Sequence, residues 1–128
     1  MGACASHIFI VDDDRSFGKS LKRLLNARGV TADYFESAGY FFDAVPTGQH
    51  GIAIVDIHMP ECDGFELMLK MQTMHYDMPV ILITGRTEGF TRDIALQQGA
   101  IGFLQKPFNE QSLLDLIRAL EEEENELP

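Results

Sequence analysis

The fold of this chain is decided by the stretch IAIVDIHMP, residues 52–60. It opens with four apolar residues, three of them β-branched, which is typical of a strand buried on both faces of a parallel sheet. Asp56 ends the strand, and Pro60 and Gly64 predict a loop leading into a helix. Open α/β sheets place their chemistry at the carboxyl ends of strands, so Asp56 is a candidate functional residue. Taken alone, it could equally cap the next element, because aspartate is common in turns.

The same order of strand and helix recurs along the chain. Apolar runs predict five strands, at residues 7–11, 30–35, 52–55, 79–84 and 101–105. Amphipathic or capped segments predict helices between and after them, at about 15–28, 37–45, 64–71, 91–98 and 109–120. This alternation predicts an α/β fold with a doubly wound parallel sheet and right-handed crossovers. The expected strand order is 2-1-3-4-5, a five-stranded (βα)5 flavodoxin-like three-layer sandwich.

Length and composition fit one globular domain. The 128 residues are 45% hydrophobic and 23% charged. The net charge is −10, and an acidic body argues against direct nucleic acid binding by this domain. No apolar run reaches the length of a membrane span, so no membrane association is expected. Two cysteines, Cys4 and Cys62, form no disulfide framework and favour a cytoplasmic location.

The two ends of the chain differ in composition from the body. We expect a leader at 1–6, the domain proper at 7–120, and at 121–128 an acidic tail or the start of a linker. Residues 1–6 match the spacing of an N-myristoylation signal. That pattern demands little of a sequence, so a small-residue leader, native or from cloning, is the favoured interpretation.

Polar side chains follow four of the predicted strands. Asp12 and Asp13 follow the first, Asp56 the third, Thr84 the fourth and Lys106 the fifth. Parallel strands end at one sheet edge, so three carboxylates should converge beside a hydroxyl and an ammonium group. Converging carboxylates repel one another unless a cation compensates, and oxygen ligands suit Mg²⁺. This arrangement predicts phosphoryl transfer to Asp56, with Lys106 neutralising the transferred group and Thr84 donating a hydrogen bond.

Each residue also has a plainer interpretation. Lys106 alone could be a surface lysine, and Thr84 alone could bond to the backbone at a strand end. Asp14 is best explained as an acid at a helix N-terminus, facing the helix dipole. The five candidate residues are much harder to dismiss together, because they fall at four strand ends.

At this point the chain resembles a known family, the receiver domains of two-component response regulators. The resemblance covers about residues 7–120 and rests on motifs in the family's order and spacing. These are IFIVDDD at 8–14, VDIHMP at 55–60 followed by Asp63-Gly64, ILITG at 81–85, Gly99-Ala100, and FLQKPF at 103–108. Many members carry alanine or serine where Gly85 stands; glycine is seen in receivers attached to transcription-regulating output domains.

The resemblance implies roles for the acidic residues. Asp56 would be the phosphorylated aspartate. Asp13 and Asp56 would bind Mg²⁺ directly, together with the backbone carbonyl of His58, and Asp12 would act through a water molecule. The His58 side chain is favoured as a solvent-exposed loop histidine. It and Arg86 nevertheless occupy positions that tune acyl phosphate hydrolysis in the family.

The resemblance also implies a switch. Lys106 would pair with Asp56 and later with the phosphoryl group, after a cis peptide bond at Pro107. Thr84 would move toward the phosphate, and Phe103 would turn inward with it. The surface of the fourth helix, fifth strand and fifth helix would then change, and a phosphorylation-dependent homodimer could form there.

A response regulator receiver accepts its phosphoryl group from a sensor histidine kinase or a histidine phosphotransfer protein. It is not an enzyme with a separate substrate, since it catalyses only its own phosphorylation and dephosphorylation. The expected function is therefore a phosphorylation-activated signalling switch, within a transcriptional regulator if an output domain follows.

Two other functional classes stay open from the residues. One is an enzyme with an aspartate nucleophile, a phosphatase or a P-loop-type ATPase. No G-x-x-x-x-G-K-[ST] motif is present, and His58 stands where a phosphatase of this kind needs a second aspartate. The other is a degenerate receiver used only for binding, which the complete set of acids, Thr84 and Lys106 disfavours.

Overall fold

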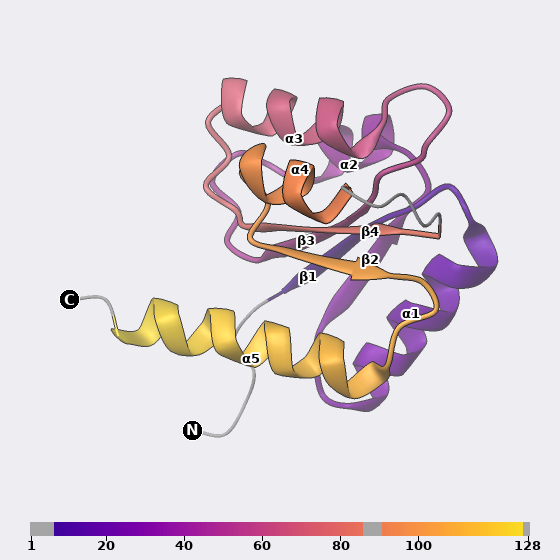
Figure 1. The fold of residues 1–128 in the computed structure, drawn as a ribbon, viewed down its shortest axis with the longest axis vertical. Coiled ribbons are helices and arrows are strands. Elements are labelled where there is room, and N and C mark those ends of the chain that lie inside the picture. The colour runs from indigo at the N-terminus through magenta and orange to yellow at the C-terminus, as the bar shows by residue number, and fades with distance from the viewer. Residues whose placement is uncertain (1–6, 86–90, 127–128) are drawn as a thin grey trace.

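The computed structural model describes residues 7–85 and 91–126 and has the expected architecture. Five parallel strands form one sheet in the order β2-β1-β3-β4-β5 (Figure 1). The strands are β1 (Ile8–Val11), β2 (Ala32–Phe35), β3 (Ile52–Asp56), β4 (Val80–Thr84) and β5 (Gly102–Gln105). The helices are α1 (Arg15–Ala27), α2 (Ala38–Ala44), α3 (Gly64–Thr73), α4 (Thr91–Gln97) and α5 (Glu110–Glu126). The predicted fold class and strand order are confirmed.

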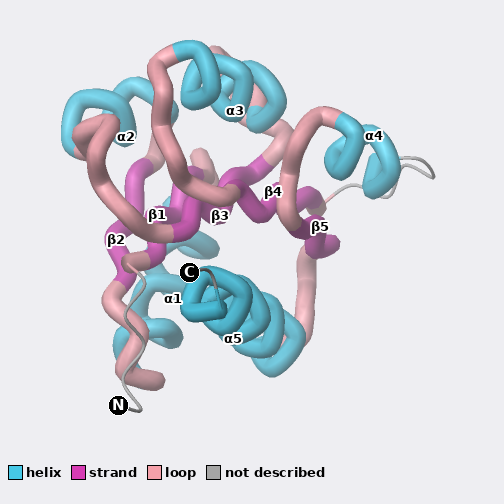
Figure 2. Tube along the Cα trace, turned by 90° about the vertical axis from the view of Figure 1, so that its left-hand side faces the viewer, coloured by secondary structure: helices cyan, strands magenta, loops and turns pink. Residues whose placement is uncertain are grey.

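The helices lie in two layers, one on each face of the sheet. Helices α2, α3 and α4 cover one face, and α1 and α5 cover the other (Figure 2). Side chains alternate along each strand, so successive residues enter different layers. Phe9, Val55 and Leu82 pack in the layer under α2 and α3, which is rich in methionine and aromatic residues. Ile10, Ile54 and their neighbours pack in an aliphatic layer under α1 and α5.

The strand register brings the candidate residues to one edge of the sheet. Val11 lies beside Val55, so Asp12 and Asp56 follow at the same level on neighbouring strands. Thr84 ends β4 and is level with Gln105, the residue before Lys106. The central strands β1 and β3 are buried along their whole length, which fixes the positions from which the two aspartates project.

Side-chain caps determine where the helices begin near this edge. Asp14 caps α1, its carboxylate accepting from the backbone N–H of Phe17 at 3.1 Å, so its role is structural. Ser37 caps α2 in the same way. Asp63 and Glu66 form a reciprocal capping box at the start of α3. These caps satisfy N–H groups that the first turn of a helix leaves without partners.

Some boundaries differ from the sequence expectations. Helix α5 continues to Glu126, six residues beyond the expected end at about residue 120. Glutamate is a good helix former, and its charge had suggested a solvated end. The leader at 1–6, Arg86 and the last two residues lie outside the described residues. Within the part that the structure describes, no helix is both long and apolar enough to span a membrane.

Candidate functional site

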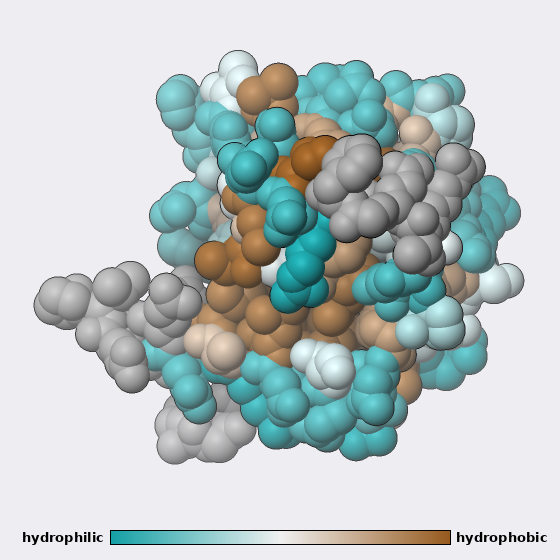
Figure 3. Space-filling view, in the orientation of Figure 1, coloured by the Kyte–Doolittle hydropathy of each residue, from teal (hydrophilic) through white to brown (hydrophobic). Residues whose placement is uncertain are grey.

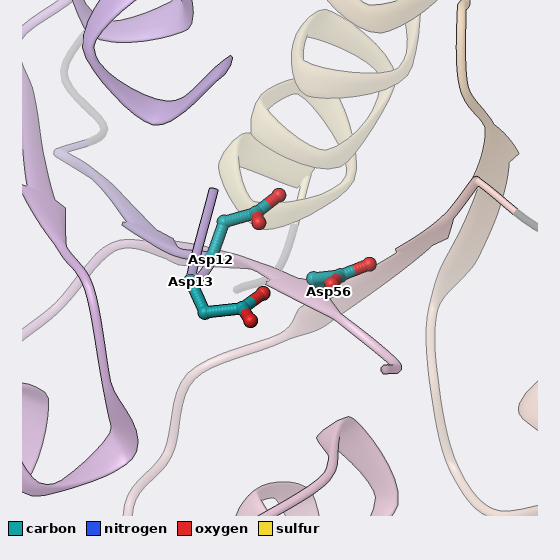
Figure 4. A group of neighbouring side chains, drawn as sticks. All are labelled: Asp12, Asp13 and Asp56. Atoms are coloured by element: carbon teal, nitrogen blue, oxygen red, sulfur yellow. The ribbon is translucent and has the colours of Figure 1, made fainter. Parts of the chain in front are cut away.

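Three carboxylates converge at the carboxyl ends of β1 and β3. Asp12 and Asp13 follow β1, and Asp56 is the last residue of β3 (Figure 4). One carboxylate oxygen from each lies within 4.8 Å of the other two. Asp12 and Asp56 are buried, whereas Asp13 is exposed. The site therefore has two of its acids in the core and opens to solvent at Asp13.

Each carboxylate oxygen of Asp12 has a positively polarised partner. Oδ1 accepts a hydrogen bond from the backbone N–H of Asp14 at 2.9 Å. Oδ2 forms an ion pair with Lys106, whose Nζ is 2.7 Å away. This oxygen is buried, so the ammonium group at close range offsets part of the cost of burying its charge.

Lys106 projects from the segment after β5 and lies between two acids. Its Nζ is 2.7 Å from Asp12 Oδ2 and 3.9 Å from Asp56 Oδ1. It also lies 4.1 Å from the centre of the Phe17 ring, a cation–π contact from α1. The sequence expectation paired Lys106 with Asp56, but its shortest contact is with Asp12. Asp12 is fully buried, so its charge has the greater need of a nearby cation.

The pKa values of the two buried acids reflect this crowding. Burial raises the pKa of Asp56 to about 6, with further increases from Asp12 and Asp13. Lys106 and the backbone N–H of His58 lower it in part. Burial also raises the pKa of Asp12, against a smaller opposing effect from Lys106. In the part of the chain that the structure describes, Lys106 is the one cation paired with these acids, which leaves the cluster short of positive charge.

The donor set and charge of this cluster are compatible with a metal site. All three candidate ligands are carboxylates, and hard divalent cations prefer oxygen. The raised pKa of Asp56, in a cluster where Lys106 already pairs with Asp12, indicates a place that favours added positive charge.

The remaining predicted residues lie around the same edge. Thr84 is fully buried at the end of β4, and its backbone carbonyl accepts from the N–H of Lys106 at 2.7 Å. Phe103 is half-buried on β5, beside Leu82 of β4. His58 is half-buried in the loop after β3. The peptide bond between Lys106 and Pro107 is cis.

Two aromatic residues near the site were not predicted to matter there. The Tyr34 hydroxyl donates to the backbone carbonyl of Asp12 at 2.6 Å, and Phe17 lies under the ammonium of Lys106. Burial raises the pKa of Tyr34 to about 12, so its hydroxyl keeps its proton at neutral pH. One signal for Tyr34 existed in the sequence, because an isolated glycine inside a helix, Gly18, suggests a close neighbour.

Comparisons with known proteins agree with the geometry. The family model of the response regulator receiver domain matches residues 8–118. The chain belongs to this family. It is 34% identical over 113 residues to the transcriptional regulatory protein FixJ of Bradyrhizobium diazoefficiens, covering 88% of this chain and 55% of that protein. It is 35% identical over 115 residues to the transcriptional regulatory protein TdiR of Thauera aromatica, covering 90% of this chain and 51% of that protein.

The similarity extends to solved structures. The crystal structure of FixJ-N superposes with a TM-score of 0.83 at 29% identity, covering 91% of this chain and 94% of that one. This receiver domain therefore has the fold and the family of a two-component signalling switch, rather than those of a phosphatase or a P-loop ATPase. The chain spans about half the length of the two curated relatives described above.

Proposed function

We propose that Asp56 accepts a phosphoryl group from a sensor histidine kinase or a histidine phosphotransfer protein, with Mg²⁺ as the cofactor. The ligands would be Asp13, Asp56 and the backbone carbonyl of His58, with Asp12 acting through water. The observation that carries the proposal is the convergence of three carboxylates beside Lys106, with one oxygen of each acid within 4.8 Å of the other two. Family membership supports the same assignment.

The chemistry needs an ionised Asp56 and positive charge around the incoming phosphoryl group. With a pKa of about 6, Asp56 is mostly a carboxylate at neutral pH. One of its oxygens forms the new P–O bond as the P–N bond of the donor phosphohistidine breaks, and the released imidazole nitrogen is protonated by solvent. Bound Mg²⁺ would neutralise charge on the phosphoryl oxygens. The ammonium of Lys106, 3.9 Å from Asp56 Oδ1, lies close enough to do the same.

The same site limits the lifetime of the product. Attack of water on phosphorus releases inorganic phosphate and regenerates the Asp56 carboxylate. The domain then catalyses only its own phosphorylation and dephosphorylation. Its signal to other proteins is a change in the structure of its surface.

Thr84 and Phe103 are proposed to transmit the effect of phosphorylation from Asp56 to the protein surface. Thr84 is buried next to the site, and Phe103 lies on the neighbouring strand. The α4–β5–α5 face beyond them presents apolar residues between α4 and α5 (Figure 3). On this face Leu96 and Ile101 are each 44% exposed. We propose that a phosphorylation-dependent homodimer forms there. Since several relatives are named as transcriptional regulators, this change of surface would act on transcription.

The proposal is tested by intact mass measurement after treatment with phosphoramidate and Mg²⁺. We expect one phosphoryl adduct that decays with time, requires Mg²⁺ and is lost in Asp56→Asn. The control Asp43→Asn, which changes an exposed acid on α2, should keep the adduct. Continuous release of phosphate without an adduct would support a phosphatase instead. A wild-type chain that forms no adduct and releases no phosphate would support a binding-only domain.

A further inference from the structure

Tyr34 connects the edge strand β2 to the acidic site. It lies beside Ile10 of β1, two residues before Asp12. Its hydroxyl donates to the backbone carbonyl of Asp12 at 2.6 Å, across a sequence separation of 22 residues. This contact acts on the main chain of the acidic segment, whereas Lys106 and Asp14 act on the Asp12 side chain.

The Asp12 carbonyl belongs to the peptide unit that joins Asp12 to Asp13. A peptide unit is planar, so a hydrogen bond that fixes the carbonyl also fixes the position of the following Cα atom. That atom is the Cα of Asp13, whose exposed carboxylate is one of the three candidate ligands. The orientation of Asp13 toward the other two acids therefore depends on this peptide plane.

Helix α1 has a glycine, Gly18, where the Tyr34 ring packs against it. A Cβ atom at Gly18 would lie 2.1 Å from Tyr34 Cε1 and 2.4 Å from Cδ1, far inside contact distance. A glycine inside a helix is unfavourable, and Gly18 in the first turn of α1 lets the ring pack against the helix backbone. The half-buried ring thus packs against α1 at Gly18, and its hydroxyl reaches the Asp12 carbonyl.

We propose that Tyr34 is a positioning residue for the acidic site, which orients the Asp12–Asp13 peptide so that the three carboxylates bind Mg²⁺ together. This inference rests on the function proposed above. It assigns to an edge-strand residue, outside every motif of the sequence analysis, control over the affinity of the site for its cation.

The experiment compares two variants that each remove one partly buried hydroxyl. Tyr34→Phe deletes the bond to Asp12 while keeping the ring beside Gly18. Tyr76→Phe is the matched control, because Tyr76 also donates to a backbone carbonyl at 2.6 Å, that of Val45, away from the acids. Mg²⁺ binding is measured by calorimetry and by the amide NMR shift of Asp13. The rate of phosphorylation by phosphoramidate is then measured against Mg²⁺ concentration.

We expect both variants to lower the melting temperature by similar amounts. Only Tyr34→Phe should raise the Mg²⁺ concentration needed for half-saturation, by about 3- to 10-fold, the range expected for one lost hydrogen bond. Its phosphorylation rate should fall at low Mg²⁺ and return to the wild-type value at saturation.

Wild-type Mg²⁺ affinity in Tyr34→Phe would overturn the inference and leave Tyr34 a structural residue. An equal loss of affinity in Tyr76→Phe would also overturn it, since general loosening would then explain the effect. If the wild-type protein itself binds no Mg²⁺, the proposed function falls together with this inference.

Discussion

The two sides of the sheet edge that carries the site are built differently. On one side, β1 and β3 lie at the centre of the sheet, and every residue of both strands is buried. On the other side, β5 is an edge strand in which only Gly102 is buried. The helix beside it, α4, buries only Ala95 among the described side chains from Arg92 to Gln97. The acids therefore project from the fully buried strands β1 and β3. The surface proposed to respond to phosphorylation is formed by β5 and α4, which bury few side chains.

This difference separates two requirements of a switch. Phosphoryl transfer needs carboxylates held at fixed positions, and strands buried on both faces provide this. A surface that reports phosphorylation needs two arrangements of similar free energy, which is easier where few side chains are buried. The predictions below test whether the two sides differ in this way, from the largest expected effect to the smallest.

The same substitution at two glycines should give very different results. A Cβ at Gly64 would meet the backbone of Asp56 and Ile57 at 2.8 and 2.9 Å, whereas at Gly102 it would meet the end of the Leu116 side chain at 2.7 Å. Backbone cannot yield, but a leucine can change rotamer. We expect Gly64→Ala to lower the free energy of unfolding by about 3 kcal/mol and Gly102→Ala by less than about 1 kcal/mol. Urea unfolding measures both, and equal losses would contradict the proposed difference in rigidity.

The buried Asp56 should make stability depend on pH when metal is removed. Its pKa is about 6 in the folded chain, above an unfolded value near 3.8. The folded state therefore binds the proton more tightly, and the resulting stability is fully present below pH 3.8 and lost as pH rises through 6. The free energy of unfolding is expected to fall by about 3 kcal/mol over this pH range.

Urea unfolding of Asp56→Asn beside the wild type, in a chelator, isolates this contribution. The free energy of unfolding of the variant should exceed that of the wild type by little at pH 4 and by about 3 kcal/mol above pH 7. Added Mg²⁺ should shrink this difference, because a cation stabilises the ionised carboxylate. An advantage that does not change with pH would show that Asp56 is not destabilised by its surroundings.

Helix α4 should open more readily than α3. Helix α3 buries Gly64, Leu67, Met68 and Met71, a far larger contact with the core than Ala95 provides for α4. We expect the free energy of local opening to be lower in α4 by about 2 kcal/mol, as measured by native-state hydrogen exchange. Equal protection of the two helices would remove the argument that α4 is the responsive element.

The smallest effect on folding is expected at Leu96, on the outside of α4. Leu96→Ser should change the free energy of unfolding by less than about 0.5 kcal/mol, because this side chain is already 44% exposed. It should nevertheless weaken the proposed dimer of the phosphorylated protein in sedimentation experiments. Leu69→Ser is the control, since Leu69 is 63% exposed on α3 and should leave association unchanged.

Much of the fold could be predicted because local signals agreed. Apolar strand runs, the acid Asp14 at the start of α1, and the acids at strand ends each depend on neighbours in sequence. The end of α5 was expected at about residue 120, six residues early, because a run of glutamates is equally typical of a solvated helix end and of a continuing helix.

Contacts between distant segments could not be predicted in the same way. The preference of Lys106 for Asp12 over Asp56 depends on a difference of about one ångström that no spacing encodes. The bond from Tyr34 to Asp12 joins an edge strand to the end of its neighbour. Such contacts follow from packing, and the only local trace of this one was the glycine at position 18.

The central claim, that Asp56 is the phosphoacceptor within a cluster of three acids, has one direct test. The wild-type chain is treated with phosphoramidate and Mg²⁺, reduced with borohydride to convert an aspartyl phosphate to homoserine, and mapped by peptide mass spectrometry. We predict homoserine at position 56 alone, with none when Mg²⁺ is omitted. Homoserine at position 12 or 13, or equal modification without Mg²⁺, would contradict the claim.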